Sequence, residues 1–295
     1  MAGRSGSIVL CALAALALGM PASEDYQGKI KAWRTDREKS LKADEGWLTI
    51  AGLHFLEEGD NSFGSSPEND IVLRTGPAHV GLITVREGVV DVAAPAGETL
   101  SVDGREVRTA RLWSGVGGDR PSIDLGALSL FCHLSGERLA IRLRDRESDI
   151  RRDFAGLRWF PADESFRVRA RYVPHERQRR MSLPNNLGDV FTVPSGGSVA
   201  FALGDQELRL LAIEDDGELW LIFRDLTSGK ETYPAARYLY ADAPDEDGFT
   251  IVDFNRAYNP PCAYNPYTTC PLPPPENRLP VRIEAGELDY RAGKR

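Results

Sequence analysis

Short apolar segments recur through most of this chain, and glycine-containing turns separate many of them. Asp103-Gly104, for example, joins two segments in which apolar and polar residues alternate, and Asp216-Gly217 joins two short, largely apolar segments. Such pairs favour tight hairpin turns, and alternation with a period of two is the pattern of a strand with one buried face. The pattern predicts an all-β fold, mainly an antiparallel sandwich or barrel.

One helix is predicted near the start of the chain. Tyr26, Ile30 and Trp33 keep helical spacing, and Ser23 is a candidate N-cap. We expect this N-terminal helix and its connection to occupy residues 23–45.

The first half of the remaining chain, residues 46–115, is similar to forkhead-associated domains, which are β-sandwiches that read phosphothreonine. The shared order is a glycine turn at Gly64, Asn-Asp-Ile-Val-Leu at 69–73, and a histidine at His79. That family carries an arginine directly after the glycine, where this chain has Ser65. The resemblance implies a sandwich and speaks against phosphopeptide binding.

The most unusual segment is 253–279, in the β-rich part expected over 120–287. It combines several prolines with tyrosines, asparagines and two cysteines. The prolines lack an amide donor and fix φ, so the segment can be neither a helix nor a central strand. Its aromatic residues argue against disorder, and a long ordered irregular segment is usually a binding or active-site loop.

Tyrosine and asparagine side chains are well suited to sugars and small polar ligands, because they offer amphipathic rings and paired donors and acceptors. The predicted ligand-binding residues are Asn255, Tyr258, Asn259, Tyr264, Asn265, Asn277 and, upstream, Arg237. The alternative is that the asparagines fold the loop on itself, since Asn side chains commonly stabilise turns.

Three carboxylates flank the loop and are candidate catalytic residues: Asp225, Asp253 and Glu276. Two of them together could supply the general acid and base of a hydrolase. Asp253 could instead accept backbone N–H bonds at a strand end. No phosphate-binding glycine loop and no histidine cluster of metal spacing occurs, so no metal or cofactor is predicted.

The beginning of the chain resembles a secretory signal. Arg4 precedes an uninterrupted apolar stretch from Ile8 to Leu18, which is too short to span a bilayer. We expect a signal peptide over residues 1–22 and a soluble, monomeric mature protein in the periplasm or outside the cell.

Export affects the interpretation of the cysteines. In an oxidising compartment, Cys262 and Cys270 are expected to form a disulfide. The alternatives are a metal site, for which this spacing is not typical, or thiols, one of which could act as a nucleophile with a histidine. Cys132 is expected to be a buried thiol.

The net charge of −8 gives no general case for nucleic acid or an anionic membrane as a partner. Residues 137–180 nevertheless contain many arginines and no lysine. Arginine suits bidentate contact with carboxylate or phosphate groups. The alternative is that these arginines pair on the surface with neighbouring acids of the same stretch.

Several motifs of the chain resemble one uncharacterised, largely bacterial family, the domain of unknown function 1684. They include Asp-Phe-Asn at 253–255, Tyr-Asn-Pro-Pro-Cys-Ala-Tyr at 258–264 and Ala-Gly-Glu at 285–287. The family implies no established reaction, so it leaves open whether the protein is an enzyme. We expect an exported protein that binds a small polar or carbohydrate ligand through the loop. An exported hydrolase is the alternative, and a structural protein of the cell envelope is the third possibility.

Overall fold

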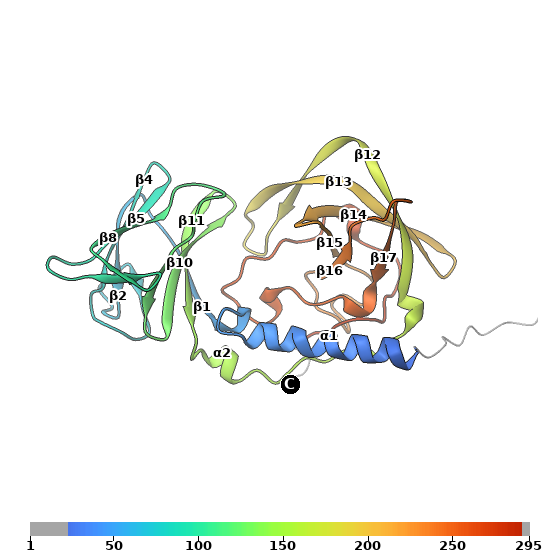
Figure 1. Ribbon diagram of the computed structural model, residues 1–295, viewed down its shortest axis with the longest axis horizontal. Coiled ribbons are helices and arrows are strands. Elements are labelled where there is room, and N and C mark those ends of the chain that lie inside the picture. The colour runs from blue at the N-terminus through green and yellow to red at the C-terminus, as the bar shows by residue number, and fades with distance from the viewer. Residues whose placement is uncertain (1–22, 291–295) are drawn as a thin grey trace, which may run out of the picture.

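The computed structural model describes residues 23–290, in which two β-rich units lie side by side and one long helix runs beneath the second of them (Figure 1). The predicted signal peptide, residues 1–22, lies outside the described residues. Nearly all strand pairs are antiparallel, with β2 and β3 as a parallel exception. The predicted fold class, mainly antiparallel β with one N-terminal helix, is confirmed.

The first unit consists of two sheets that share one apolar core. One sheet has the order β1-β11-β10-β9-β6-β7, formed by β1 (Ile50–Phe55), β6 (Leu100–Val102), β7 (Arg105–Val107), β9 (Ser122–Leu125), β10 (Leu128–Ser135) and β11 (Arg138–Asp145). The other has the order β3-β2-β4-β5-β8, formed by β2 (Gly59–Gly64), β3 (Ile71–Val72), β4 (Gly81–Arg86), β5 (Val89–Ala93) and β8 (Thr109–Trp113). The forkhead-associated topology itself stays a prediction.

Local sequence explains much of this unit. In β10, Leu128, Leu130 and Cys132 alternate along the strand and are all buried in the shared core. Asp103 and Gly104 both have positive φ, as a two-residue hairpin turn between β6 and β7 requires. The unit extends further than we expected, because β9, β10 and β11 complete its first sheet beyond residue 115.

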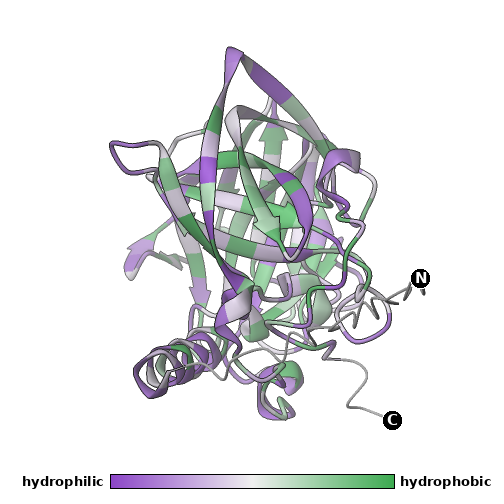
Figure 2. Cartoon of the chain, turned by 90° about the vertical axis from the view of Figure 1, so that its right-hand side faces the viewer, coloured by the Kyte–Doolittle hydropathy of each residue, from purple (hydrophilic) through white to green (hydrophobic). Residues whose placement is uncertain are grey.

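The second unit is a single curved sheet with the order β16-β15-β14-β13-β12-β17. Its strands are β12 (Arg167–Pro184), β13 (Val190–Leu203), β14 (Gln206–Asp215), β15 (Glu218–Phe223), β16 (Arg237–Asp242) and β17 (Phe249–Asp253). The edge strands β16 and β17 approach each other, and Thr250 Oγ1 donates to the carbonyl of Asp242 at 2.8 Å. The sheet is therefore nearly closed into a barrel, whose strands carry hydrophobic and hydrophilic residues in turn (Figure 2).

The helix α1 (Glu24–Lys42) crosses beneath the barrel (Figure 1). The Ser23 side chain accepts a hydrogen bond from the amide of Tyr26, which confirms the predicted N-cap. Much of the contact of α1 with the barrel unit is polar. Arg34 donates to the carbonyl of Phe160 at 3.1 Å, and Glu38 accepts from the amide of Leu157 at 2.8 Å. A short helix, α2 (Asp149–Arg152), lies in the connection between the units.

The predicted loop, residues 253–279, is irregular as expected but largely buried. It contains three short 3-10 helices, η3 (Phe254–Arg256), η4 (Pro261–Ala263) and η5 (Pro275–Asn277). Two further 3-10 helices, η1 (Trp47–Thr49) and η2 (Glu164–Phe166), lie earlier in the chain. Ala257 and Leu279 of the loop join the apolar core of the barrel. The loop therefore closes the barrel core and is not a projecting surface loop.

The disulfide predicted between Cys262 and Cys270 is wrong for this structure. Both residues are buried, and their sulfur atoms are not bonded to each other. Instead, the backbone N–H of Cys262 donates to Sγ of Cys270 at 3.2 Å. The turn made by η4 brings the amide of Cys262 toward the second sulfur, an arrangement that sequence spacing alone does not specify. Cys132 is a buried thiol, as expected.

Candidate functional site

The four asparagines predicted to bind a ligand are almost completely buried. Asn255 and Asn259 are 0 % exposed, and Asn265 and Asn277 are 1 % exposed. Asn277 shows what such side chains do: its amide oxygen accepts from the amide of Leu211 at 2.8 Å, and its amide nitrogen donates to the carbonyls of Leu211 and Ile222. The side chain thus supplies hydrogen bonds to backbone groups in places where no strand is available to do so.

Asn265 and Asn255 act in the same way at other places. Asn265 donates to the carbonyls of Trp47 and Ile50, which ties the loop to the start of the first unit. The amide oxygen of Asn255 accepts from the backbone amide of Asp163 at 3.0 Å, and its amide nitrogen donates to the backbone carbonyl of Asp163 at 2.8 Å. These contacts agree with the alternative that the sequence left open, in which the asparagine side chains stabilise the fold of the loop.

Arg237 and Asp225 form a buried ion pair. Arg237 is 1 % exposed, and its guanidinium also donates to the backbone carbonyls of Ile283 and Ala285. The second oxygen of Asp225 accepts from the amide of Thr227 at 2.6 Å. Each charge is compensated within the protein, so the pair holds the chain after the loop against β16.

Glu287 is the centre of a second buried polar cluster, which our sequence analysis did not assign to the site. Its carboxylate accepts from the backbone amide of Asn259 at 3.1 Å, from the side-chain amide of Asn259 at 2.8 Å, and from the hydroxyl of Tyr264. Burial raises the pKa of Glu287 to about 7, although the positive charge of Arg37 opposes this shift. The Ala-Gly-Glu motif was the sequence signal that marked this residue.

The three candidate catalytic carboxylates do not share one site. Asp225 is buried against Arg237, whereas Glu276 is exposed on η5 and lines a hollow of about 320 Å³ beside Arg179 and Arg180. Asp253 lies elsewhere, where both of its carboxylate oxygens accept from the hydroxyl of Tyr26 at 2.7 and 2.9 Å.

A cavity of about 740 Å³ lies between α1 and the outer side of β16 and β17. Two predicted site residues, Asp253 and Tyr258, line it. The other aromatic and charged lining residues are the aromatic Tyr26, Trp33 and Tyr240, the basic Lys29, Arg37, Arg167 and Arg256, and the acidic Asp25, Asp36, Glu164, Glu218 and Asp242. Aromatic surfaces and charges of both signs therefore meet in one open space.

Neighbouring side chains hold the aromatic residues of this cavity in place. The guanidinium of Arg37 lies 4.2 Å from the ring centroid of Tyr258 and donates to the carbonyl of Asn259 at 3.1 Å. Tyr240 stacks on Trp220 at an interplanar angle of 8°, and its hydroxyl donates to Asp215. Burial raises the pKa of Tyr258 to about 12, so its hydroxyl is neutral at physiological pH. Arg37 thus connects the cavity with the cluster around Glu287.

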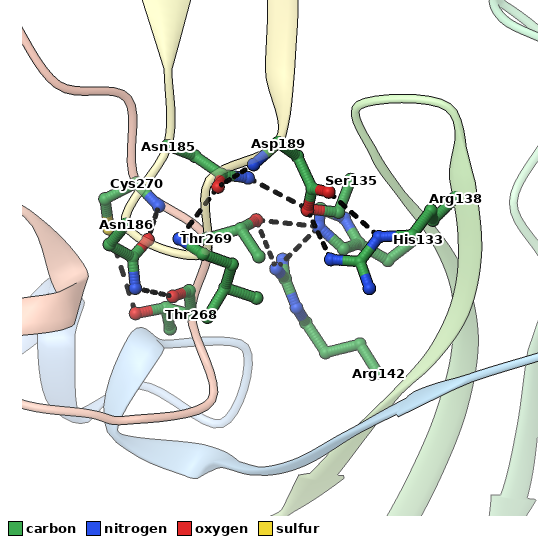
Figure 3. Close-up of polar contacts among 11 residues, drawn as sticks. His133, Ser135, Arg138, Arg142, Asn185, Asn186, Asp189, Thr268, Thr269 and Cys270 are labelled. Carbon is green, nitrogen blue, oxygen red and sulfur yellow. Dashed lines mark hydrogen bonds and ion pairs between the residues drawn. The ribbon is translucent and has the colours of Figure 1, made fainter.

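The end of the loop also contributes to a polar interface between the two units (Figure 3). The Thr269 hydroxyl lies 2.8 Å from Nε2 of His133, and Arg142 lies within 3.2 Å of both groups. Because Arg142 can only donate, Nε2 of His133 must be the unprotonated acceptor. Burial and the positive charges of Arg142 and Arg120 lower the pKa of His133 to about 3, so the imidazole is neutral.

The adjacent part of this interface is formed by the turn between β12 and β13 (Figure 3). Arg138 makes two hydrogen bonds to Asp189, at 2.8 and 2.7 Å, and Ser135 donates to the same carboxylate. These contacts lower the pKa of Asp189 to about 2. Arg138, Ser135 and Asp189 are engaged with one another across the interface, so this network holds the two units together.

Within residues 23–290, no group of three or more His, Cys, Asp and Glu side chains is placed to hold a metal ion. In the same part of the chain, no helix is long and apolar enough to cross a membrane.

Comparison with known proteins gives one matching family and a related structure. Residues 152–288 match the family described as Protein of unknown function (DUF1684). The chain is similar to an uncharacterized protein of Haloarcula marismortui whose solution structure was solved by NMR, with 33 % identity over 47 % of this chain and 78 % of that chain and a TM-score of 0.40. No curated protein matches. The family match, which includes the motifs of the loop, shows that the chain belongs to the DUF1684 family.

Proposed function

We propose that this protein binds a small polar ligand, with carbohydrates as the best-matched class, in the cavity between α1 and the strands β16 and β17. The observation that carries the proposal is an open space of about 740 Å³ in which Tyr258 and Asp253 of the loop region face charged residues of α1. Binding sites for small molecules are concave, usually about 300–1,000 Å³, and combine aromatic surfaces with a few placed polar groups.

The chemistry of the lining supports a hydroxyl-rich ligand. The rings of Tyr258 and Tyr240 are fixed by Arg37 and Trp220, so a sugar that stacks on them would order few additional side chains. Asp253, which is already oriented by Tyr26, offers a carboxylate that can accept hydrogen bonds from hydroxyl groups.

The loop has a narrower role in this proposal than the sequence indicated. Tyr258 contacts the ligand, whereas the buried asparagines position the segment that carries it. Hydrolysis by the three candidate carboxylates is less well supported, because Asp253 lines the cavity while Asp225 and Glu276 lie elsewhere.

Export remains part of the proposal and is supported by the sequence of residues 1–22 alone. Expression of the full chain in a bacterial host, followed by cell fractionation and mass measurement of the N-terminus, tests it. We expect a periplasmic or secreted product that begins near Ser23. A full-length product in the cytoplasm would contradict export.

Ligand binding can be tested by saturation-transfer NMR with a panel of oligosaccharides and polyols. We expect signal transfer to at least one sugar, loss of transfer in Tyr258→Ala, and unchanged transfer in Tyr267→Ala. Tyr267 is a matched control, because it belongs to the same loop, is 40 % exposed and does not line the cavity.

A second variant separates loss of binding from loss of folding. Asp242 is exposed at the end of β16 and lines the cavity, so Asp242→Asn changes its charge without altering the core. We expect weaker binding with an unchanged circular dichroism spectrum. If no sugar of the panel shows transfer, or if transfer persists in both Tyr258→Ala and Asp242→Asn, the proposed site is wrong.

A further inference from the structure

A basic groove of about 510 Å³ lies where the end of α1, the loop after β3 and the connection around α2 meet. Its basic lining residues come from three separate segments: Lys42, Arg74, Arg146, Arg151 and Arg152. Among the described residues, Glu147 is the one acidic residue that lines it. The groove shares no lining residue with the cavity of the proposed function.

Two of these cations have no carboxylate partner within residues 23–290. Lys42 is exposed in the last turn of α1, and no acidic side chain of the described chain lies within ion-pair distance of it. The Arg146 side chain donates to a backbone carbonyl, that of Gly126. Both positive charges are therefore uncompensated at close range and face the groove.

The other arginines are paired, but three of their four ion pairs lie on the surface. Arg151 pairs with Asp44, which is 67 % exposed. Arg152 pairs with Asp149 and Asp153, which are 67 % and 62 % exposed. Exposed ion pairs of this kind contribute little to stability, so they hold the guanidinium groups only weakly. An incoming anion can therefore recruit these groups at small cost.

Arg74 differs because it pairs with the buried Asp145. This contact uses Nη2 of Arg74, and the side chain itself is 60 % exposed. A guanidinium group has five N–H donors, so most of the donors of Arg74 remain available. The buried carboxylate fixes the arginine at the groove while leaving its outer edge free.

We propose that this groove binds a small soluble anion with phosphate-type oxygens. Forked guanidinium donors match such oxygens in pairs, and Lys42 adds a compact charge from the helix end. The volume exceeds what a single inorganic phosphate fills, so a diphosphate or an organic phosphate fits the space better. The site is independent of the sugar-binding proposal, and either can fail without the other.

Isothermal titration calorimetry with inorganic pyrophosphate at low ionic strength tests the proposal. Removing one charge-assisted hydrogen bond should weaken binding about tenfold in Arg146→Gln and in Lys42→Gln. Added salt should weaken binding of the wild-type protein as well. Glu147→Gln should strengthen binding, because it removes a negative charge from the lining of the groove.

The matched control is Arg111→Gln, which removes an exposed arginine that pairs with Asp91 in the first unit. It should leave pyrophosphate affinity unchanged. If pyrophosphate does not bind, or if Arg111→Gln weakens binding as much as Arg146→Gln, the proposal is wrong. Backbone NMR shifts of wild-type residues 146–152 on titration give a readout that needs no variant: shifts confined to this segment and its neighbours support the site, and their absence contradicts it.

Discussion

The two β units of this protein close their cores by different means. In the first unit, two sheets cover each other, and the core consists almost entirely of strand side chains such as Ile83, Val92 and Leu130. In the second unit, the irregular chain after β17 completes the core with Ala257, Leu279, Ile283 and Ala285. An irregular chain in a protein interior cannot satisfy its own backbone groups, so buried side chains must do it.

This difference explains why one set of buried polar groups and the family motifs lie in the second unit. Asn255, Asn259, Asn277, Arg237 and Glu287 are all in the second unit. The family match, residues 152–288, covers that unit and not the first sandwich. We infer that many motif residues mark the closure of the barrel, while the surfaces available to ligands lie beside it. The predictions below test this contrast.

The largest effect is expected for Arg237. Arg237→Met leaves the Asp225 carboxylate buried without its cation, which should lower the free energy of unfolding by about 3–5 kcal/mol. Arg111→Gln, which breaks an exposed pair in the first unit, should cost at most about 1 kcal/mol. Urea unfolding measures both. The double variant Arg237→Met/Asp225→Leu should be more stable than Arg237→Met alone. Equal losses of unfolding free energy in Arg237→Met and Arg111→Gln would contradict the difference that we infer between the buried and the exposed pair.

The next prediction concerns pH. Burial raises the pKa of Glu287 from its ordinary value of 4.5 to about 7. The folded protein therefore binds this proton more tightly than the unfolded chain does. The stability from this group is complete below about pH 4.5 and is lost as the pH rises through 7, by about 3 kcal/mol in total.

Glu287→Gln provides the comparison for this pH dependence. The difference in unfolding free energy between wild type and Glu287→Gln should change by about 3 kcal/mol between acidic and mildly alkaline solution, in favour of the wild type at low pH. Denaturant titrations at several pH values measure this difference. A difference that is constant with pH would show that Glu287 does not titrate with a raised pKa.

A smaller effect is expected for Asn277, which bonds three backbone groups of β14 and β15. Asn277→Ala should lower the free energy of unfolding by about 2–3 kcal/mol, because buried donors and acceptors lose their partners. Its neighbour Glu276 is exposed on the same 3-10 helix, so Glu276→Ala should change stability by less than about 0.5 kcal/mol. Similar thermal denaturation midpoints for the two variants would contradict the structural role of Asn277.

The smallest effect is expected at the contact between α1 and the barrel unit. Tyr26→Phe removes the hydroxyl that bonds both oxygens of Asp253, at a cost of about 1–2 kcal/mol. The loss should be local, so amide hydrogen exchange should quicken along α1 more than in β10 of the first unit. Tyr267→Phe, at an exposed tyrosine, should leave both rates unchanged. Equal acceleration in α1 and β10 would show that the helix and the first unit do not open separately.

The sequence indicated the regular elements well, because their signals are local. The hairpin at Asp103-Gly104 and the N-cap at Ser23 depend on residues next to each other, and the structure contains both. The irregular course of residues 253–279 follows from proline chemistry in the same way. The disulfide was predicted from spacing and compartment, and it failed because the relative placement of the two sulfur atoms depends on the fold of η4.

The side-chain roles were decided by tertiary structure. Nothing in the sequence around Asn277 tells whether its amide meets a ligand or the backbone of β14, because the answer lies in a strand more than sixty residues away. The cavity and the basic groove likewise depend on α1 lying against segments far along the chain. By itself, the sequence determined the β architecture, the helix and the family. Only the folded chain decided which polar groups are buried and which face solvent, because burial depends on distant segments that periodicity and spacing do not describe.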